Sequence, residues 1–299
     1  MGRHSPAQME GSVPDLKRRI SVVVLTYNRK VEVCHTLRRM LALPQAIDII
    51  VVDNASTDGT RDLIHSEFPQ VRFVCLPRNV GAAARNVGVE MANTPYIAFC
   101  DDDSWWAAGS LERAVHILDA HPRVAALCAR ILLGPQEAED PVCQVLANSP
   151  LPSAGLPGRA LLGFIACATV VRRAAYLQAG GYEQRFFVGG EEELLSIDLV
   201  SNGWSVVYAP ELTIHHYPSP QRDNPGRQKI VLRNTLWVSW LRLPFASALR
   251  QTWATCRSAR DIRTLAAALL EALRELPWVW RERRVISPQV HQMYRVLRD

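Results

Sequence analysis

Residues 20–29 read ISVVVLTYNR, and residues 47–56 read IDIIVVDNAS. Each stretch begins with β-branched and apolar residues, which is typical of a strand buried on both faces, and ends in polar turn residues. Residues 31–43 lie between them and have apolar positions at helical spacing. A strand, a helix and a second strand in this order predict an α/β unit with a parallel sheet.

The same alternation continues along the chain, and YIAFC at residues 96–100 is a further buried strand. We therefore predict an α/β fold with a Rossmann-like, mainly parallel sheet flanked by helices. Ligands bind such a sheet beyond the carboxyl ends of its strands, where TYNR, DNAS and DDD fall. The expected strands are residues 20–25, 47–52, 71–76, 96–100, 124–133, 160–171 and 204–209, the expected helices are 31–43, 60–68, 82–92, 111–120 and 191–203, and residues 134–158 are an expected loop.

Charge divides the chain into two parts. The 299 residues carry a formal charge of +5, but residues 223–299 alone hold 14 basic and 6 acidic side chains. Five of the eight tryptophans also lie in this last part. We expect a flexible tail over residues 1–19, one α/β domain over residues 20–222 and a basic, tryptophan-rich helical region over residues 223–299.

The composition excludes several classes of protein. A chain that is 48% hydrophobic is not disordered, and seven scattered cysteines without a C-x-x-C pair indicate a reducing compartment. With no signal segment and no spanning run, we expect a cytoplasmic protein, at most peripheral on the inner face of the plasma membrane. No G-x-G-x-x-G, P-loop or nucleic-acid-binding module is present, and nothing indicates the oligomeric state.

Three aspartates, Asp101, Asp102 and Asp103, follow the strand over residues 96–100 directly. Adjacent carboxylates repel one another, so a cation or solvent must relieve the repulsion. Hard divalent cations bind one or two carboxylates together with substrate phosphates, and Asp101 and Asp103 project to one side of an extended segment. The alternative is a solvated cap of the helix over residues 111–120.

Asp53 ends the strand over residues 47–52, where a carboxylate can accept from a ribose hydroxyl or a base N–H. An Asx turn is the structural alternative. Arg85 follows the small residues 81–84, which allow the backbone of a helix start to approach a phosphate. Such starts are also common where helices pack closely.

A second acidic cluster, Glu191, Glu192 and Glu193, opens a predicted helix. Glutamates stabilise a helix N-terminus, and this explains one or two of the three. Neighbouring like charges also raise a carboxyl pKa, as a general base requires. His215 and His216, in a loop after the strand over residues 204–209, are candidates for a metal ligand or a phosphate contact, or have a structural role.

Together, several segments resemble the family 2 glycosyltransferases of the GT-A fold, from about residue 20 to residue 217. They are ISVVVLTYNR, VVDNASTDGT, RNVGAAARNVGVEMA, YIAFCDDDSWW, GGYEQRFFVGGEEELLSIDL and the loop with His215 and His216. The resemblance implies that a sugar moves, with inversion, from a nucleotide-diphosphate sugar to an acceptor hydroxyl. By likeness, the nucleotide sugar is bound by Thr26, Tyr27, Asn28, Asp53, Arg85, Asp101 and Asp102.

The resemblance also implies a metal ion. Asp101 and Asp103 match the D-x-D motif that holds Mg²⁺ or Mn²⁺ on the diphosphate, and His216 matches the family's histidine better than His215 does. The expected chemistry is a single in-line displacement in which the metal stabilises the leaving diphosphate.

The base is implied by GGEEELLSIDL, which is similar to the family's G-E-D-x-D-L segment. Its usual base position falls on Glu192, where Glu replaces Asp, and Leu194 replaces the later Asp. Because of these differences, Glu191 and Glu193 stay as alternatives for the base.

The acceptor side is less defined. Trp105 and Trp106 are candidates for stacking on an acceptor sugar, with Glu193 beside it, or they pack against the helix over residues 111–120. Q-x-x-R-W is absent, which favours transfer of one or a few sugars to a glycan, lipid-linked or secondary-metabolite acceptor. A sugar nucleotidyltransferase and an inactive nucleotide-sugar-binding module are the competing interpretations.

The C-terminal part contains two predicted amphipathic helices, over residues 228–243 and 258–276, the second with Ser258 as N-cap. One interpretation is that their apolar faces pack on the α/β domain. The other is peripheral contact with an anionic membrane surface, where lipid-linked acceptors reside.

Overall fold

The computed structural model describes residues 15–218 and 226–298. In these residues a mixed sheet has the strand order β3-β2-β1-β4-β9-β6-β10-β5, with β7 paired to β6 and β8 to β10. Most of the predicted tail and the predicted boundary at residue 222 lie outside the described residues. The strands are β1 Ile20–Thr26, β2 Asp48–Asp53, β3 Arg72–Cys75, β4 Tyr96–Asp101, β5 Ser104–Trp106, β6 Val124–Leu133, β7 Ala138–Glu139, β8 Arg159–Leu161, β9 Thr169–Arg172 and β10 Ser205–His216.

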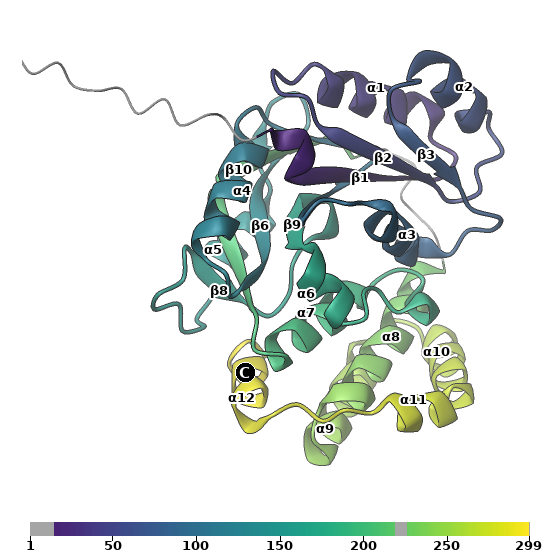
Figure 1. The fold of residues 1–299 in the computed structure, drawn as a ribbon. Helices are drawn as coiled ribbons and strands as arrows, with labels where there is room; N and C mark the ends of the chain where they lie inside the picture. The colour runs from purple at the N-terminus through teal and green to yellow at the C-terminus, as the bar shows by residue number, and fades with distance from the viewer. Residues whose placement is uncertain (1–14, 219–225, 299) are drawn as a thin grey trace, which may run out of the picture.

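Helices cover the sheet and extend beyond it. Figure 1 shows α1 and α2 on one side of β1, β2 and β3, and α3 on the other side, as right-handed crossovers require. The helices are α1 Lys30–Leu41, α2 Thr60–Glu67, α3 Ala84–Met91, α4 Ser110–Ala120, α5 Pro141–Ala147, α6 Arg173–Gln178, α7 Glu191–Ser201, α8 Arg227–Arg242, α9 Phe245–Ser258, α10 Ile262–Arg274, α11 Leu276–Glu282 and α12 Pro288–Val296.

The predicted α/β class is confirmed, and the structure adds that the sheet is mixed. Strands β1 to β4 pair in parallel, but β9 runs antiparallel to both β4 and β6. The carboxyl ends of β1, β2 and β4 therefore meet at one edge, which is where the polar segments were expected.

Several expected elements differ from the structure. Residues 160–171 are not one strand, because β8 pairs with β10 while β9 pairs with β4 and β6, so the chain must turn between them. Residues 134–158 contain α5, which starts at Pro141 and has Asp140 as N-cap. Leu16 is buried in a 3₁₀ turn, so this part of the predicted tail packs on the core.

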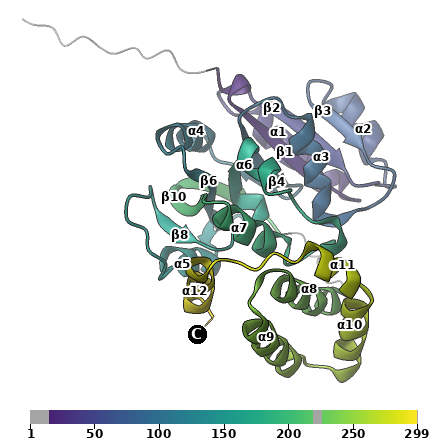
Figure 2. The same ribbon diagram turned by 60° about the horizontal axis from the view of Figure 1, so that its bottom comes forward.

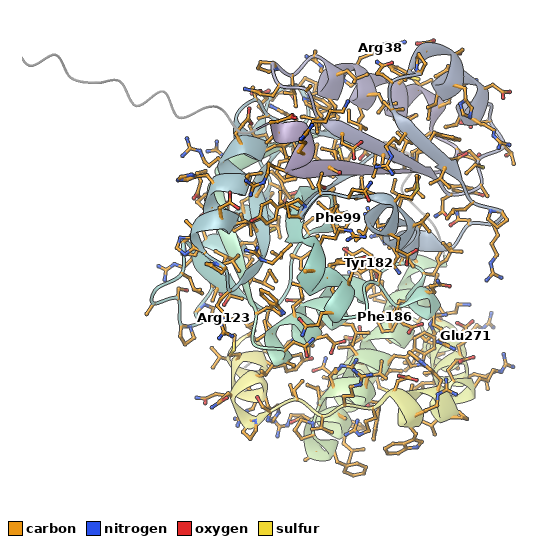
Figure 3. All side chains as sticks on the ribbon, in the orientation of Figure 1. Arg38, Phe99, Arg123, Tyr182, Phe186 and Glu271 are labelled. Carbon is orange, nitrogen blue, oxygen red and sulfur yellow. The ribbon has the colours of Figure 1, made fainter. Side chains whose placement is uncertain are left out.

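The C-terminal helices pack on the α/β domain through a second apolar core. Trp237 and Leu241 of α8 share this core with Ile197 of α7 and with Phe186, which precedes α7. Figure 3 places Phe186 between the two parts, with Tyr182 and then Phe99 of β4 farther from the C-terminal helices. One face of α8 thus packs on the α/β domain, which is the first of the two interpretations of the C-terminal helices.

The predicted helix over residues 258–276 is wrong at its start. Ser258 is the last residue of α9, and α10 begins at Ile262 after the N-cap Asp261, whose carboxylate accepts from the backbone of Thr264. None of the helices in the described ranges is long and apolar enough to cross a membrane.

Candidate active site

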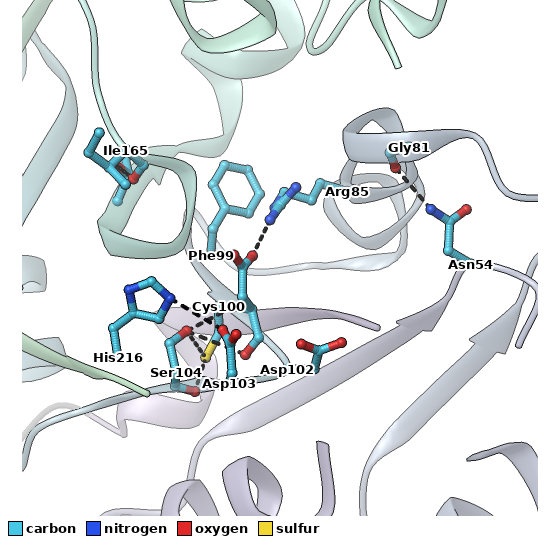
Figure 4. A network of polar contacts seen from close by, with 12 residues as sticks. Asn54, Gly81, Arg85, Phe99, Cys100, Asp102, Asp103, Ser104, Ile165 and His216 are labelled. Carbon is cyan, nitrogen blue, oxygen red and sulfur yellow. Dashed lines mark hydrogen bonds and ion pairs between the residues drawn. The ribbon is translucent and has the colours of Figure 1, made fainter. Parts of the chain in front are cut away.

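The three aspartates lie at the end of β4, each beside an arginine. Figure 4 shows Asp102 and Asp103 there, with Arg85 and His216 near the cluster. Arg85 forms an ion pair with Asp101. Arg29 lies 3.3 Å from Asp102 and 3.1 Å from Asp103. The expected repulsion is therefore relieved by two arginines, Arg29 from the start of α1 and Arg85 from α3.

Burial affects the pKa of two groups in this cluster, Asp102 and Arg85. It raises the pKa of Asp102 to about 7, and Arg29 opposes this shift while the neighbouring aspartates add to it. Burial lowers the pKa of the Arg85 guanidinium, but Asp101, Tyr182 and Glu192 together more than offset this and raise that pKa above its usual value. Arg85 thus stays charged, as its expected contact with a nucleotide diphosphate requires.

His216 is the histidine that faces the aspartates. It ends β10 rather than lying in a loop, and its Nε2 is 3.4 Å from Oδ1 of Asp103. Pairing of β10 with β5 fixes this approach, because His216 is opposite Ser104. His215 points elsewhere: it lies 3.1 Å from Glu137 and stacks on Trp105.

The predicted nucleoside residues gather at the ends of β1 and β2. Thr26 is buried and Tyr27 is 44% exposed. The side chain of Asn28 accepts from the backbone of Thr57, and its own N–H donates to Ser56, so the loops after β1 and β2 are tied together. Among these predicted nucleoside residues, Tyr27 therefore has the side chain that is exposed and accessible to a ligand.

Asp53 forms the turn that was its structural alternative. Its Oδ1 accepts from the N–H of Ser56 at 3.0 Å and from the hydroxyl of Ser56 at 2.5 Å. The side chain is wholly buried, and Oδ2 accepts no hydrogen bond from the described residues. A buried carboxylate oxygen without a donor is costly, so this atom is the one on which a nucleoside role rests.

The segment before Arg85 is held by close backbone contacts. The amide of Asn54 donates to the carbonyl of Gly81 (Figure 4), and the N–H of Ala82 donates to the carbonyl of Phe187. Gly81 has φ of +66°, and a Cβ there would overlap the carbonyl of Phe187. Only glycine allows this approach, which joins the start of α3 to the loop before α7.

Glu191 and Glu192 at the start of α7 have no cationic partner within the described ranges, in contrast to the aspartates. Burial, with the charge of Glu191, raises the pKa of Glu192 to about 8, and Arg85 opposes this. Burial also raises the pKa of Glu191, whose Oε2 accepts no hydrogen bond from any described residue. Glu193 instead pairs with Arg298 at 2.7 Å.

Glu192 also lines a cavity of about 660 Å³. The cavity lies between α5, residues 161–165, the start of α7 and the C-terminal segment of the chain. Arg85 and Asp101 both contribute to its pKa, so Glu192 lies within electrostatic reach of the aspartate cluster and also lines this cavity. No other predicted residue except Glu193 lines it.

The expectation that Trp106 contacts an acceptor is wrong. The side chain is fully buried, and its Nε1 donates to the carbonyl of Phe99. Trp105 is 7% exposed, with Arg39 over its ring and Tyr217 against it. Strand β5, which the sequence analysis did not include, turns both rings into the protein.

The residues fit a divalent metal ion that takes some of its ligands from the protein and the rest from a substrate. In the described ranges no three acidic, histidine or cysteine side chains converge on one point. Asp103 and His216 do converge, and one or two protein ligands suffice for Mg²⁺ when phosphates supply the rest. Asp101, the third expected ligand, is occupied by Arg85.

Three residues of the site had no predicted role. Arg29 ends the TYNR segment and was visible in the sequence. Asn234 of α8 donates to the carbonyls of Phe186, Val188 and Gly189, directly before the glutamates. Arg298 is 105 residues from its partner Glu193, and no sequence signal connects the two.

Comparison with known proteins agrees with this geometry. The family model for glycosyl transferase family 2 matches residues 21–176. N-acetylglucosaminyl-diphospho-decaprenol L-rhamnosyltransferase of Mycobacterium tuberculosis is 25% identical over 280 residues, which cover 79% of this chain and 90% of that protein.

Two solved structures share the fold. S. aureus TarS has a TM-score of 0.63 and 17% identity, over 93% of this chain and 53% of that longer one. The mannosyltransferase PcManGT from Pyrobaculum calidifontis, in complex with GDP-Man and Mn²⁺, has a TM-score of 0.57 and 17% identity, over 94% of this chain and 86% of that one. The chain has the GT-A fold of these structures, belongs to glycosyl transferase family 2, and is a glycosyltransferase.

Proposed function

We propose that the protein transfers a sugar from a nucleotide-diphosphate sugar to a hydroxyl of a lipid-linked glycan, with inversion, in polysaccharide biosynthesis. The observation that carries the proposal is the position of Glu192, which lines a cavity and lies within electrostatic reach of Arg85 and Asp101. A base placed between a diphosphate site and a second pocket has a donor on one side and an acceptor on the other.

The donor side uses the ends of β1, β2 and β4. Tyr27 and Asp53 bind the nucleoside, and Arg85, held by Asp101, faces the diphosphate. Asp103 and His216 would hold Mg²⁺ or Mn²⁺ on the phosphates. When bound, the metal neutralises the charge that develops on the leaving diphosphate.

The acceptor side uses Glu192. Its carboxylate takes the proton of the acceptor hydroxyl, and the oxygen attacks the anomeric carbon as the bond from that carbon to the diphosphate oxygen breaks. The raised pKa makes Glu192 a stronger base than an exposed glutamate. The acceptor class is supported by the mycobacterial relative, whose name gives a diphospho-decaprenol-linked acceptor.

A transfer assay tests this function. The protein is screened by thermal shift against UDP-, dTDP- and GDP-sugars with Mn²⁺, and the best donor is then offered with polyprenyl-diphosphate N-acetylglucosamine. Glu192→Gln should lower kcat by about 10²–10⁴-fold while donor binding is retained. Glu67→Gln, on the exposed surface of α2, is the matched control. Near-normal transfer by Glu192→Gln would exclude it as the base, and full activity in EDTA would exclude the metal.

We also propose that the C-terminal helices contact the cytoplasmic face of the membrane that holds such an acceptor. Phe245, Leu249 and Trp253 recur every four residues on α9 and are 59%, 48% and 68% exposed. Trp280, 53% exposed, lies next to Trp240. Arginines interleave with these side chains, as in helices that lie on anionic lipid.

Flotation with anionic liposomes tests the membrane contact. Wild-type protein should float with the vesicles at low salt, and the double variant Trp253→Glu, Trp280→Glu should stay in solution. Val31→Glu, equally exposed but on α1, should float like wild type. Equal flotation of all three proteins, or none at any salt concentration, excludes this surface.

A further inference from the structure

The last helix, α12, leaves the other C-terminal helices and returns to the α/β domain. Figure 2 shows it beside α5 and apart from α8, α9 and α10. The segment before it is pinned to the end of α8, because the N–H of Arg284 donates to Leu241 and that of Ile286 donates to Arg242. An extended segment thus connects the other C-terminal helices to α12 and places α12 against the α/β domain.

Several contacts fix α12 in this place. Tyr294 is 7% exposed and shares an apolar core with Leu194 and Ile197 of α7. Arg298 donates to Glu193 at 2.7 Å, with its guanidinium 5.4 Å from the ring of Tyr294. The Arg298–Glu193 pair joins the end of the chain to the residue next to the proposed base.

In this place α12 forms one wall of the 660 Å³ cavity. Tyr294, Leu297 and Arg298 line it on one side, and Glu192 and Glu193 line it on another. This volume is typical of a small-molecule site. Without the last eleven residues the cavity would be open on that side.

The remaining lining is mostly apolar, from Val145 and Leu146 of α5 and from residues 161–165. Val145 of α5 is 70% exposed and Leu297, directly after α12, is 41% exposed, so two separate parts of the chain contribute exposed apolar side chains to the lining. A lining that combines less exposed carboxylates with exposed apolar side chains matches a ligand that is polar at one end and apolar at the other.

We propose that this cavity binds the acceptor, and that α12 is the wall that recognises an apolar group attached to the acceptor sugar. The sugar hydroxyl points to Glu192, and the apolar group lies between Val145 and Leu297. Arg298 is a positioning residue that holds α12 against Glu193. This inference rests on the proposed function, because it takes Glu192 as the base.

Calorimetry with the full-length protein tests the apolar wall. The probes are octyl β-D-glucoside below its critical micelle concentration and methyl β-D-glucoside, which share the sugar and differ in the chain. Burial of several methylene groups should make the octyl compound bind at least about tenfold more tightly. Leu297→Glu should remove most of this difference. Val296→Glu, the neighbouring exposed residue that does not line the cavity, should preserve it.

Three outcomes would overturn the proposal. They are equal affinity for the two glucosides, equal loss in Leu297→Glu and Val296→Glu, and loss in Leu273→Glu instead, since Leu273 lines a separate apolar groove among α8 to α11. Val145→Glu, on α5, repeats the test should Leu297→Glu disturb α12. A wild-type protein that binds octyl glucoside but no nucleotide sugar would overturn the proposed function and leave the apolar site standing.

Discussion

The two acidic triplets, residues 101–103 and residues 191–193, have the same formal charge and opposite surroundings. The aspartates lie at a strand end with Arg29, Arg85 and His216 around them. Of the three glutamates of the second triplet, only Glu193 has an ion pair within the described residues, with Arg298.

The difference shows how one fold gives carboxylates two uses. An ion-paired carboxylate keeps its charge and can exchange its partner for another cation. A carboxylate that is buried without a partner has a raised pKa and readily takes up a proton. Asp102 combines both conditions, since burial raises its pKa to about 7 while Arg29 opposes the shift.

For the aspartate triplet, the largest expected effect comes from removing its charge. Asp103→Asn should lower kcat/KM for transfer by about 10²–10³-fold, because the proposed metal ligand is lost and Arg29 and His216 lose their shared anion. Initial rates are measured against Mn²⁺ concentration, with Asp62→Asn of α2 as an exposed control. An unchanged rate and an unchanged Mn²⁺ dependence in Asp103→Asn would show that the two triplets do not differ in this way.

The next effect concerns the proton on Glu192. Only the carboxylate form accepts a proton, so kcat/KM should rise about tenfold per pH unit and level off above about pH 8, the raised pKa of this group. Glu191→Gln removes the neighbouring negative charge, and should therefore move the whole profile to lower pH. A profile that is flat between pH 6 and pH 9 would contradict a base with a raised pKa.

The sequence predicts the members of each triplet but not their partners. The apolar run over residues 96–100 ends directly before the aspartates, and this predicts their position at the sheet edge. Strand burial and turn residues are local signals, so the sequence shows them directly. Arg298 reaches Glu193 only through the folding of α8 to α12, and a contact of this separation has no local signal.

The same limit explains the errors in the fold. Residues 160–171 are apolar throughout because both β8 and β9 are buried, and periodicity cannot show where a buried chain bends. Trp106 follows a polar cluster and resembles a surface residue in the sequence. Its burial depends on pairing with Ile214, more than a hundred residues later.

A smaller effect tests how the glutamates are positioned. The side-chain amide of Asn234 donates to three carbonyls in the loop before α7 and so positions the glutamates. The aspartates, in contrast, are positioned by the end of β4. Asn234→Ala should lower kcat about tenfold with little change in the KM for donor, because buried carbonyls lose their donor and the loop shifts. Thr235→Ala on the same helix is the control. A change in donor KM alone would place the effect at the aspartates instead.

The smallest effect is on stability, and its sign separates the two triplets. An unfolded glutamate releases its proton near its usual pKa of 4.5, and native Glu192 does so only near 8, so native stability is lost as the pH rises between these values. Glu192→Gln cannot ionise and should unfold at a temperature about 2–4 °C above that of wild type at pH 8, with a smaller difference at pH 5. Asp103→Asn should instead unfold at a lower temperature, because Arg29 and His216 lose a partner. Thermal melts at the two pH values measure both. If Glu192→Gln were less stable than wild type at pH 8, Glu192 would be a paired carboxylate like Asp103, and the two triplets would not differ in kind.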